Sequence, residues 1–392
     1  MDQVVAYLNT LNPSVPEYIV MGVMGVSFLY QLYFYIRYMA GVNRVVRREK
    51  KAEQPSEPAQ WPGVTVIVSA RNEAYNLKEY LLHLLEQDYP EFEVVVINDG
   101  SEDSTDGVLS QLLLRYKNLR LTFVPRDARV GSSKKLALTL GAKAAHYDLL
   151  LLTDADCVPE SNQWIRQMMS RFTEDKDIVL GFSPYFQERG VLNDLISYDT
   201  LFTGLQYMGM ALSHHPYMGV GRNLAYRKQT FFSSGGFTPY LALKAGDDDL
   251  LVNHLATARN TTVVCSRESI VWSVPKDEWG EWLHQKRRHL SVSPHYKAST
   301  KCRLTIEPIT RALFYLSVIA ACCLATPLMW ALAALLFLTR LVITMTIINR
   351  SARHFHTRRV GPQIVLYDIC LPLLTLTNML ILAIFPSKRN RW

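Results

Sequence analysis

Residues 149–160 read LLLLTDADCVPE, a run of four leucines followed by two aspartates one residue apart, Asp154 and Asp156. A short apolar run that ends in polar residues is typical of a buried strand. Carboxylates this close together repel each other unless a cation neutralises them. Hard divalent ions such as Mg²⁺ and Mn²⁺ prefer oxygen ligands of this kind, often shared with a diphosphate. The stretch therefore predicts a buried strand that ends at a site for a divalent cation.

Two earlier stretches have the same organisation. VTVIVSARNE at residues 64–73 and FEVVVINDGSEDST at residues 92–105 begin with β-branched and apolar residues and then turn polar. Helix-length segments separate the three predicted strands, which indicates a parallel α/β sheet. Such sheets bind ligands at the carboxyl ends of their strands. The polar residues expected at that edge are Arg71, Glu73, Asp99, Asp154 and Asp156.

Other acidic and metal-binding signals have simpler interpretations. Asp103 and Asp106, in GSEDSTDG, are typical turn formers and helix caps. The chain contains neither GxxxxGKS/T nor GxGxxG, so no P-loop or dinucleotide fingerprint competes with the strand-end site. Its six cysteines include no CxxC pair and its ten histidines no HExxH motif. The sequence therefore indicates neither a disulfide framework nor a zinc site.

Three apolar stretches are long enough to cross a bilayer, which takes about 20 residues. They lie at 17–40, 312–348 and 363–386, and the second could form two helices joined near Pro327. The first lacks the flanks of a cleaved signal peptide, so we expect a retained anchor. The expected domains are an anchor with a basic flank at 1–48, a linker at 49–62, a soluble domain at 63–305 with an interfacial helix near 278–292, and C-terminal transmembrane or interfacial helices at 306–392.

The formal net charge of +7 is concentrated beside these apolar stretches. Residues 44–51, 350–359 and 387–392 hold twelve Lys and Arg residues against a single Glu. This distribution favours a lipid bilayer with anionic lipid as the partner, and it argues against nucleic acid. Basic residues that follow an apolar segment mark its cytoplasmic flank. We therefore expect a multi-pass protein of a bacterial cytoplasmic membrane, with its soluble domain in the cytoplasm.

Short motifs follow one another along the chain: SARNE (69–73), VINDGSEDST (96–105), SSKKLAL (132–138), TDAD (153–156), GVGRNLAYRK (219–228), AGDDDLLVNHL (245–255) and QKRRH (285–289). A DxD motif alone occurs often by chance, but the ordered set resembles glycosyltransferase family 2. The resemblance is to its membrane-integrated branch, which includes cellulose, hyaluronan and poly-N-acetylglucosamine synthases, and it covers nearly the whole chain. It implies an α/β, GT-A-like nucleotide-sugar domain, Rossmann-like with a mostly parallel sheet, flanked by transmembrane α-helices.

The resemblance also implies roles for individual residues. Asp248 corresponds to the catalytic base, with Asp247 and Arg288 beside it, and Asp156 and Asp154 correspond to ligands of Mg²⁺ or Mn²⁺. The positions that correspond to nucleotide-sugar binding are Ala70, Arg71, Glu73, Asp99, Lys134 and Asp154, and those on the acceptor side are Arg222, Asn223 and Gln285. QKRRH departs from the family's QxxRW, because His289 stands where the tryptophan belongs.

The implied reaction is an inverting, metal-dependent transfer of a sugar from a UDP-sugar to a lipid-linked or membrane-presented glycan acceptor. Asp248 would accept the proton of the acceptor hydroxyl, while Lys134, Arg288 and the metal stabilise the leaving diphosphate. The first alternative is a processive polysaccharide synthase with its own translocation channel. The missing tryptophan and the small number of apolar segments argue against it. The second alternative is a non-catalytic sugar-nucleotide-binding scaffold, although a binding module needs no base.

Several features also have a structural interpretation. The acids at 247–249 precede an apolar run and could cap a helix, and WGEWLHQKRRHL at 279–290 could form an amphipathic helix at the bilayer surface. Arg340, inside an apolar run, either lines a polar path or lies near a bend. Asp368 and Pro372 indicate that the last segment lies in the interface or re-enters. The sequence specifies neither the sugar, the acceptor and the linkage nor the oligomeric state.

Overall fold

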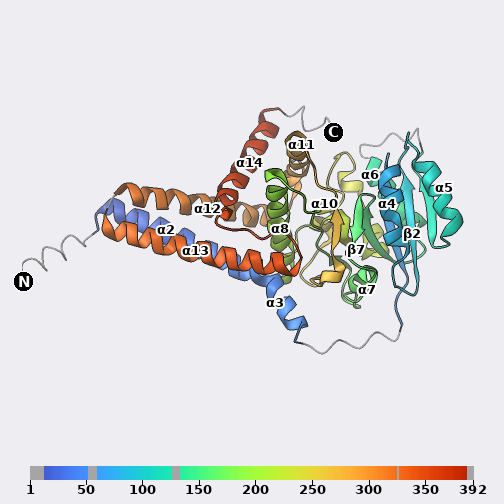
Figure 1. Ribbon diagram of the computed structural model, residues 1–392, viewed down its shortest axis with the longest axis horizontal. Coiled ribbons are helices and arrows are strands. Elements are labelled where there is room, and N and C mark those ends of the chain that lie inside the picture. The colour runs from blue at the N-terminus through green and yellow to red at the C-terminus, as the bar shows by residue number, and fades with distance from the viewer. Residues whose placement is uncertain (1–12, 52–59, 126–132, 325, 386–392) are drawn as a thin grey trace, which may run out of the picture.

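The computed structural model describes residues 13–51, 60–125, 133–324 and 326–385. It consists of an α/β domain and a set of long helices that extends from one side of that domain (Figure 1). Helices from both ends of the chain pack together in the extended part. The fold class predicted from the sequence is confirmed by the α/β domain and by the long apolar helices beside it.

A seven-stranded sheet forms the centre of the α/β domain, in the order β3-β2-β1-β4-β7-β6-β8. The first four strands in this order are parallel, β7 is antiparallel to β4 and β6, and β8 is parallel to β6. The strands are β1 Val64–Ala70, β2 Phe92–Asn98, β3 Leu119–Phe123, β4 Leu149–Asp154, β6 Ile178–Leu180, β7 Leu224–Arg227 and β8 Thr261–Val263. A separate two-stranded sheet pairs β5 (Cys157–Pro159) with β9 (Val271–Ser273).

The four leucines of the opening stretch occupy β4, between β1 and β7. Leu150 and Leu152 belong to one hydrophobic core, and Leu149 and Leu151 to the core on the other face of the sheet. A strand that is covered on both faces needs apolar residues at every position, which explains the unbroken run. Because β1, β2 and β4 are parallel, their carboxyl ends meet at one edge, where Asp154 lies.

Helices cover both faces of the sheet. One core contains residues of α4, α5 and α7, and the other contains residues of α6 and α8 together with residues of the N-terminal helix. The helix bounds are α4 Ala74–Leu85, α5 Thr105–Arg115, α6 Ser133–Ala144, α7 Trp164–Met169, α8 Val191–Leu212, α9 Lys228–Ser233, α10 Asp249–Leu255 and α11 Trp279–Leu290. Since α8 packs on both the sheet and the long helices, it connects the two parts of the molecule.

Within the described residues, four helices are long and apolar enough to cross a membrane: Val15–Glu49, Ala298–Leu324, Pro327–His354 and Ile364–Ile384. The first combines α2 (Val15–Phe34), a π-helical segment (Tyr35–Met39) and α3 (Ala40–Glu49), and the others are α12, α13 and α14. The predicted turn near Pro327 is present, because α13 begins at that residue. However, α12 begins well before the apolar run, so the helix starts inside the segment assigned to the soluble domain. Most of the predicted linker lies outside the described residues.

The N-terminal helix makes a close contact with α8. Gly209 of α8 lies against the backbone of Tyr38 in the π-helical segment, and a Cβ at this position would overlap the Tyr38 carbonyl oxygen. Gly41 approaches the same glycine one turn later. Val42 and Val46 of α3 are buried in the core that α8 shares with the sheet. The predicted anchor therefore continues past the apolar stretch into the interior of the α/β domain.

Helix α14 is oriented differently from the other long helices. Figure 1 shows α2, α12 and α13 running alongside one another, whereas α14 leaves this bundle at a steep angle and passes beside α11. Its second turn carries Asp368, which is buried and paired with Arg340. Arg340 therefore does not line an open path, because its guanidinium group is buried between helices and paired with Asp368.

Candidate active site

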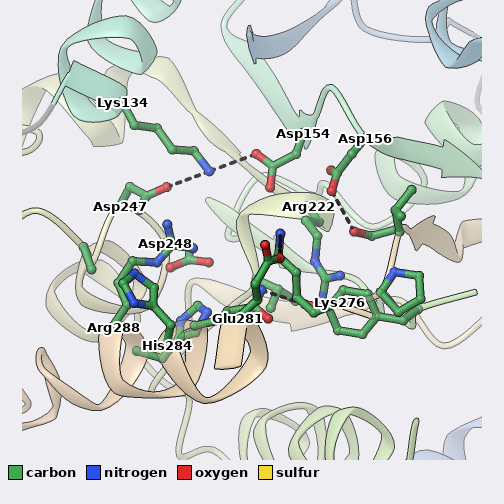
Figure 2. Close-up of a pocket in the computed structure, with 18 of the residues that line it drawn as sticks. Lys134, Asp154, Asp156, Arg222, Asp247, Asp248, Lys276, Glu281, His284 and Arg288 are labelled. Atoms are coloured by element: carbon green, nitrogen blue, oxygen red, sulfur yellow. Dashed lines mark hydrogen bonds and ion pairs between the residues drawn. The ribbon is translucent and has the colours of Figure 1, made fainter. Parts of the chain in front are cut away.

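A cavity of about 1250 Å³ opens at the carboxyl ends of the central strands. Its walls come from β4 and the residues that follow it, from the loops before α10, and from one face of α11. The candidate residues that line it are Glu73, Lys134, Asp154, Asp156, Arg222, Asp247, Asp248, Gln285 and Arg288, together with His289. Residues distant in the sequence thus face one space, as the strand-end pattern predicts (Figure 2).

Lys134, on the first turn of α6, links two acidic groups across the cavity. Its Nζ lies 2.9 Å from Asp154 Oδ1 and 3.2 Å from Asp247 Oδ2 (Figure 2). Burial alone would lower the pKa of Lys134, but the two carboxylates outweigh burial and raise this pKa. The lysine therefore stays charged, and it joins the TDAD strand end to the acidic loop before α10.

Asp156 lies next to Asp154 in the cavity wall, without a cationic partner of its own within ion-pair distance in the described residues. Its Oδ2 accepts a hydrogen bond from Ser273 Oγ at 3.3 Å, and its Oδ1 a weak one from Cys157 Sγ at 3.3 Å. Burial and the neighbouring Asp154 raise the pKa of Asp156, and the charge of Arg222 opposes them. A cation beside Asp156 would remove this unfavourable charge.

The pair of carboxylates fits a divalent ion that is completed by substrate. Among the described residues no group of three or more His, Cys, Asp or Glu side chains could hold a metal by itself. Mg²⁺ in proteins commonly takes one or two carboxylates and fills its remaining positions with phosphate oxygens and water. Asp154 and Asp156 supply hard oxygen donors of that type at an open cavity wall.

Asp248 is both a helix cap and a residue of the cavity wall. It caps α10, because its Oδ1 accepts a hydrogen bond from Asp249 N at 2.7 Å, and its Oδ2 accepts one from Gly221 N at 2.8 Å. It also lines the cavity. Burial and the charge of Asp247 raise the pKa of Asp248, so the carboxylate gains proton affinity while the backbone fixes its orientation. A helix cap and a candidate base coexist in one residue.

Asp249, the next residue, is buried outside the cavity lining. Its Oδ2 accepts a hydrogen bond from Tyr296 Oη at 2.7 Å, and its Oδ1 accepts one from Leu250 N at 2.7 Å. Burial, followed by repulsion from Asp248, raises the pKa of Asp249 to about 8. Tyr296 precedes α12, so this contact ties the acidic loop to the start of a long helix.

Helix α11 forms the opposite wall and has two faces. His284, Gln285, Arg288 and His289 lie on the face toward the cavity, whereas Trp282 is buried on the other side. The imidazole of His289 is exposed to the cavity, yet desolvation by the surrounding protein and the nearby charge of Arg288 lower its pKa. The segment predicted as an interfacial helix is therefore also part of the site.

Arg222 connects the strand-end wall with α11. Its guanidinium group stacks on the Tyr185 ring, 4.2 Å from the ring centroid, and donates to Ser183 O at 3.1 Å. Gln285 Nε2 of α11 donates to Tyr185 Oη at 3.0 Å. Nη1 of Arg222 finds no hydrogen-bond partner within the part of the chain that the structure describes. This nitrogen is buried, although other atoms of Arg222 line the cavity beside Asp156.

The amide of Asn223, expected on the acceptor side, is not available to a substrate. The side chain is fully buried; Nδ2 donates to Phe182 O at 2.8 Å and to Ser269 O at 2.7 Å, and Oδ1 accepts from Trp164 Nε1 at 3.0 Å. All of its hydrogen-bonding groups join strands and helices inside the domain. The Asn223 side chain therefore lies outside the cavity lining, since side chains of neighbouring residues can point to opposite sides, and its role on the acceptor side stays a prediction.

Three candidates for nucleotide binding lie at the strand ends but outside the cavity lining: Ala70, Arg71 and Asp99. Ala70 is buried at the end of β1, where its carbonyl accepts from Asp99 N at 2.8 Å, and Arg71 is exposed. Their contribution to binding stays a prediction.

Asp103, interpreted as a turn former, accepts hydrogen bonds from Ala74 N and from the Thr105 backbone and side chain.

Lys135 is a residue of the site that sequence reasoning missed. Its side chain is fully buried, and Nζ donates to the carbonyls of Tyr240 (2.9 Å), Leu243 (2.6 Å) and Ala245 (2.6 Å). It thereby holds the loop that leads into Asp247. The doublet of lysines in SSKKLAL was visible, but nothing in the sequence shows that its second member points into the protein.

The fold is that of a known class of enzymes. A solved structure of the mannosyltransferase PcManGT from Pyrobaculum calidifontis, in complex with GDP-Man and Mn²⁺, is 20% identical to this chain with a TM-score of 0.54. The match covers 87% of this chain and 99% of that one. At this level of identity the likeness shows the fold, which is the GT-A fold of glycosyltransferases.

Two curated relatives match parts of the chain. The poly-beta-1,6-N-acetyl-D-glucosamine synthase of Staphylococcus epidermidis is 35% identical over 103 residues, which are 26% of this chain and 24% of the synthase. The probable glycosyltransferase YdaM of Bacillus subtilis is 22% identical over 236 residues, which are 58% of this chain and 54% of YdaM. The matched regions thus span a quarter to about half the length of these relatives.

The fold, the cavity and the relatives together define a glycosyltransferase of the GT-A type, related to polysaccharide synthases. Residues 28–384, most of the chain, match the sequence profile of glycosyl transferase family 21. The chain belongs to glycosyl transferase family 21. The resemblance to membrane-integrated synthases is confirmed by the relatives, whereas the narrower assignment to family 2 is not.

Proposed function

We propose that this protein transfers a sugar from a UDP-sugar to a hydroxyl group of a lipid-linked or membrane-presented glycan acceptor, in an inverting reaction that depends on Mg²⁺ or Mn²⁺. The observation that carries the proposal is the cavity in which Asp156 and Asp248 face the same space, with Lys134 between the loops that bear them. A donor diphosphate and an acceptor hydroxyl need these two acids for different tasks.

The β4 wall would bind the donor. A divalent cation held by Asp154 and Asp156 would neutralise the diphosphate as it leaves. Lys134 remains charged beside Asp154 and faces the same space, so it adds a fixed positive charge for the leaving group. Arg288 contributes a second one from α11. Preorganised charges of this type typically contribute about 10²- to 10³-fold to a rate.

Asp248 would serve as the base for the acceptor. The acceptor oxygen attacks the anomeric carbon on the face opposite the diphosphate, its proton passes to the Asp248 carboxylate, and the bonding electrons leave with the diphosphate. A single displacement of this kind inverts the anomeric configuration. The raised pKa of Asp248 supports this role, because a base works best when its pKa approaches the working pH. The hydrogen bond from Gly221 N keeps the carboxylate aimed at the cavity.

The relatives support a nucleotide-sugar donor, although they differ in its identity. The related synthase is named for a polymer of N-acetylglucosamine, and PcManGT was solved with GDP-Man and Mn²⁺. Uridine is the nucleoside implied by the resemblance to glycosyltransferase family 2, to which the motifs SARNE and VINDGSEDST contribute. We therefore propose a UDP-sugar, with a GDP-sugar as the first competitor to be tested.

The acceptor side would face a membrane. Four described helices are apolar and long enough to span a bilayer, and α11 lies between the cavity and α14. The basic residues that follow the first apolar segment support a cytoplasmic position of the α/β domain in a bacterial membrane. An acceptor that is anchored in that bilayer would reach the cavity along α11.

A processive synthase is the second candidate, because a relative that matches the chain is named as a polymer synthase. The departure from QxxRW at His289 argues for the transfer of one or a few sugars. A scaffold without turnover is the third, and the oriented carboxylate of Asp248 argues against it.

Release of UDP or GDP by the purified full chain in lipid nanodiscs tests the proposal. A panel of UDP- and GDP-sugars is supplied with Mg²⁺ or Mn²⁺ and a membrane-lipid extract as the acceptor source. We expect turnover of one UDP-sugar that is abolished by chelation and by Asp156→Asn. Asp175→Asn changes an exposed aspartate that pairs with Lys176, far from the cavity lining, and serves as the matched control. Nucleotide binding without turnover under every condition would favour the scaffold.

A further inference from the structure

Charged side chains form an interhelical polar cluster where α12, α13 and α14 meet. Asp368 Oδ2 accepts from Arg340 Nη1 at 2.7 Å, and Asp368 Oδ1 lies 3.6 Å from Arg311 Nη1. Arg311 also pairs with Glu307, four residues earlier on α12. Gln31 of α2 accepts from Arg340 Nη2 at 3.0 Å. Two acids and two arginines therefore neutralise one another, and all four are buried among apolar helices.

The cluster is connected to the α/β domain through α8. Tyr198 of α8 donates its hydroxyl to Asp368 Oδ1 at 3.0 Å. The next residue, Asp199, forms an ion pair with Lys286 of α11. Successive residues of an α-helix point about 100° apart, so adjacent positions on α8 reach in two directions. One reaches the polar cluster, and the other reaches the helix that lines the cavity.

A second connection runs through α14. Trp282 and Leu283 of α11 pack in one hydrophobic cluster with Tyr367 and Leu371, the residues around the first turns of α14. Asp368, the residue after Tyr367, joins this part of α14 to α8, α12 and α13. The opposite face of α11 carries Gln285 and Arg288 into the cavity. The position of the cavity wall thus depends on two elements, α8 and α14, which are joined by the hydrogen bond from Tyr198 to the Asp368 carboxylate.

We propose that Asp368 and Tyr198 are positioning residues, which fix α11 against the α/β domain and so place Gln285 and Arg288 in the wall of the cavity. Neither residue lines the cavity. Burying ionisable groups between apolar helices costs free energy. Their presence here therefore favours a specific positioning role over a general contribution to helix packing. The expected effect on turnover rests on the proposed transfer reaction, whereas the placement of α11 does not.

Two substitutions of the same chemistry separate this role from general stabilisation. Tyr198→Phe and Tyr315→Phe each remove one hydroxyl group that donates to Asp368, at 3.0 Å from α8 and at 3.2 Å from α12. Only the first breaks the connection to the α/β domain. Lys286→Met breaks the second contact of α8, with α11 itself. Each change is small enough to leave the charge balance of the cluster intact.

Hydrogen exchange of the full chain in nanodiscs measures the position of α11 without any substrate. Loss of one hydrogen bond should increase the opening of α11 (Trp279–Leu290) by about 3- to 10-fold in Tyr198→Phe and Lys286→Met. Exchange in α4, on the other face of the sheet, should stay unchanged. Tyr315→Phe should leave α11 at the wild-type rate. Equal exchange of α11 in both tyrosine variants, or no change in Tyr198→Phe, would overturn the proposal.

The kinetic counterpart uses the donor found in the panel. Tyr198→Phe should lower kcat by about 3- to 10-fold, because Arg288 is displaced, while the donor KM stays within about twofold, because Asp154 and Lys134 lie on another wall. Unchanged kcat in Tyr198→Phe together with increased exchange of α11 would overturn the link to turnover. If the wild type transfers no sugar, the proposed reaction fails, and the exchange experiment still decides the placement of α11.

Discussion

The cavity and the interhelical polar cluster both contain carboxylates close to cationic side chains. They differ in how completely these charges are paired. In the cluster, Asp368 contacts Arg311 and Arg340, and the group is closed among apolar helices. In the cavity, Lys134 balances Asp154 and Asp247, while Asp156 has no cationic partner within ion-pair distance among the described residues and faces open space.

This difference distinguishes groups that can act on a substrate from groups that stabilise the fold. A group whose partners are all supplied by the protein has little left for a substrate, so its removal should act on stability and geometry. A group that leaves a donor or acceptor facing a cavity is the one that a substrate can complete. Asp248 belongs to the second kind, although two backbone N–H groups orient it, because a carboxylate has about four acceptor positions.

The largest effect is expected for the base. Asp248→Asn keeps the shape of the side chain but removes its proton affinity, and the loss of a general base typically lowers kcat by about 10²- to 10⁴-fold. Stability should fall by about 1–3 kcal/mol, because the amide oxygen can accept from only one of the two backbone N–H groups and the other loses its acceptor. UDP release at saturating donor measures the rate. Retention of more than about a tenth of kcat would remove Asp248 from the mechanism.

The polar cluster should respond in the opposite way. Asp368→Leu leaves Arg340 unpaired among apolar helices, and breaking a buried pair in this way costs about 3–5 kcal/mol of stability. In Asp368→Leu/Arg340→Leu most of this loss should be recovered, since Arg311 keeps Glu307 as a partner. Thermal denaturation in nanodiscs compares the three proteins. A double variant as unstable as the single one would show that the pair is not self-contained.

An effect of similar size is expected in the pH dependence of stability. The pKa of Asp249 is about 8 in the folded protein and about 3.9 in an unfolded chain. Between these values only the folded protein holds the proton, so the contribution to stability is present at low pH and is lost as the pH rises from about 4 to 8. The slope is at most about 1.4 kcal/mol per pH unit.

Asp249→Asn isolates this contribution. The thermal midpoint of the wild type should fall more steeply from pH 5 to pH 8 than that of the variant, which has no proton to lose. Parallel curves for the two proteins would show that Asp249 keeps an ordinary pKa.

The smallest effect is expected at His289. His289→Trp restores the tryptophan of QxxRW at a position exposed to the cavity, where a larger ring finds space. Changes at exposed positions usually alter the free energy of unfolding by about ±0.5 kcal/mol, so the stability of the variant should match that of the wild type. Product length, measured by mass spectrometry, should stay the same as in the wild type. Longer products from the variant would favour the processive alternative.

Much of the site could be predicted because strand ends are local features. Apolar runs followed by polar residues located β1, β2 and β4, and parallel pairing then brought Glu73 and the DAD acids to one edge. Lys134 and Asp248 came from the resemblance, and the structure places both in the cavity. A motif preserves the spacing of its residues along the chain, so it can identify individual residues that line the cavity.

What could not be predicted depends on contacts between distant segments. Asn223 lies within a recognised motif, but its neighbours at Phe182, Ser269 and Trp164 turn its amide inward. The partner of Arg340 is 28 residues away on a helix that crosses the bundle, and no periodicity indicates that crossing. Lys135 follows Lys134 directly, and only the packing of α6 decides which of the two enters the cavity.

The contact between Gly209 and Tyr38 has a practical consequence for dissecting the protein. Because the first helix continues into the core through Val42 and Val46, a fragment that begins at residue 60 would leave one side of α8 bare and apolar. Such a fragment should aggregate rather than behave as a soluble enzyme, and replacing the first helix by an unrelated membrane segment should not rescue it. The N-terminal helix is therefore part of the folded core, and an unrelated membrane anchor cannot replace it.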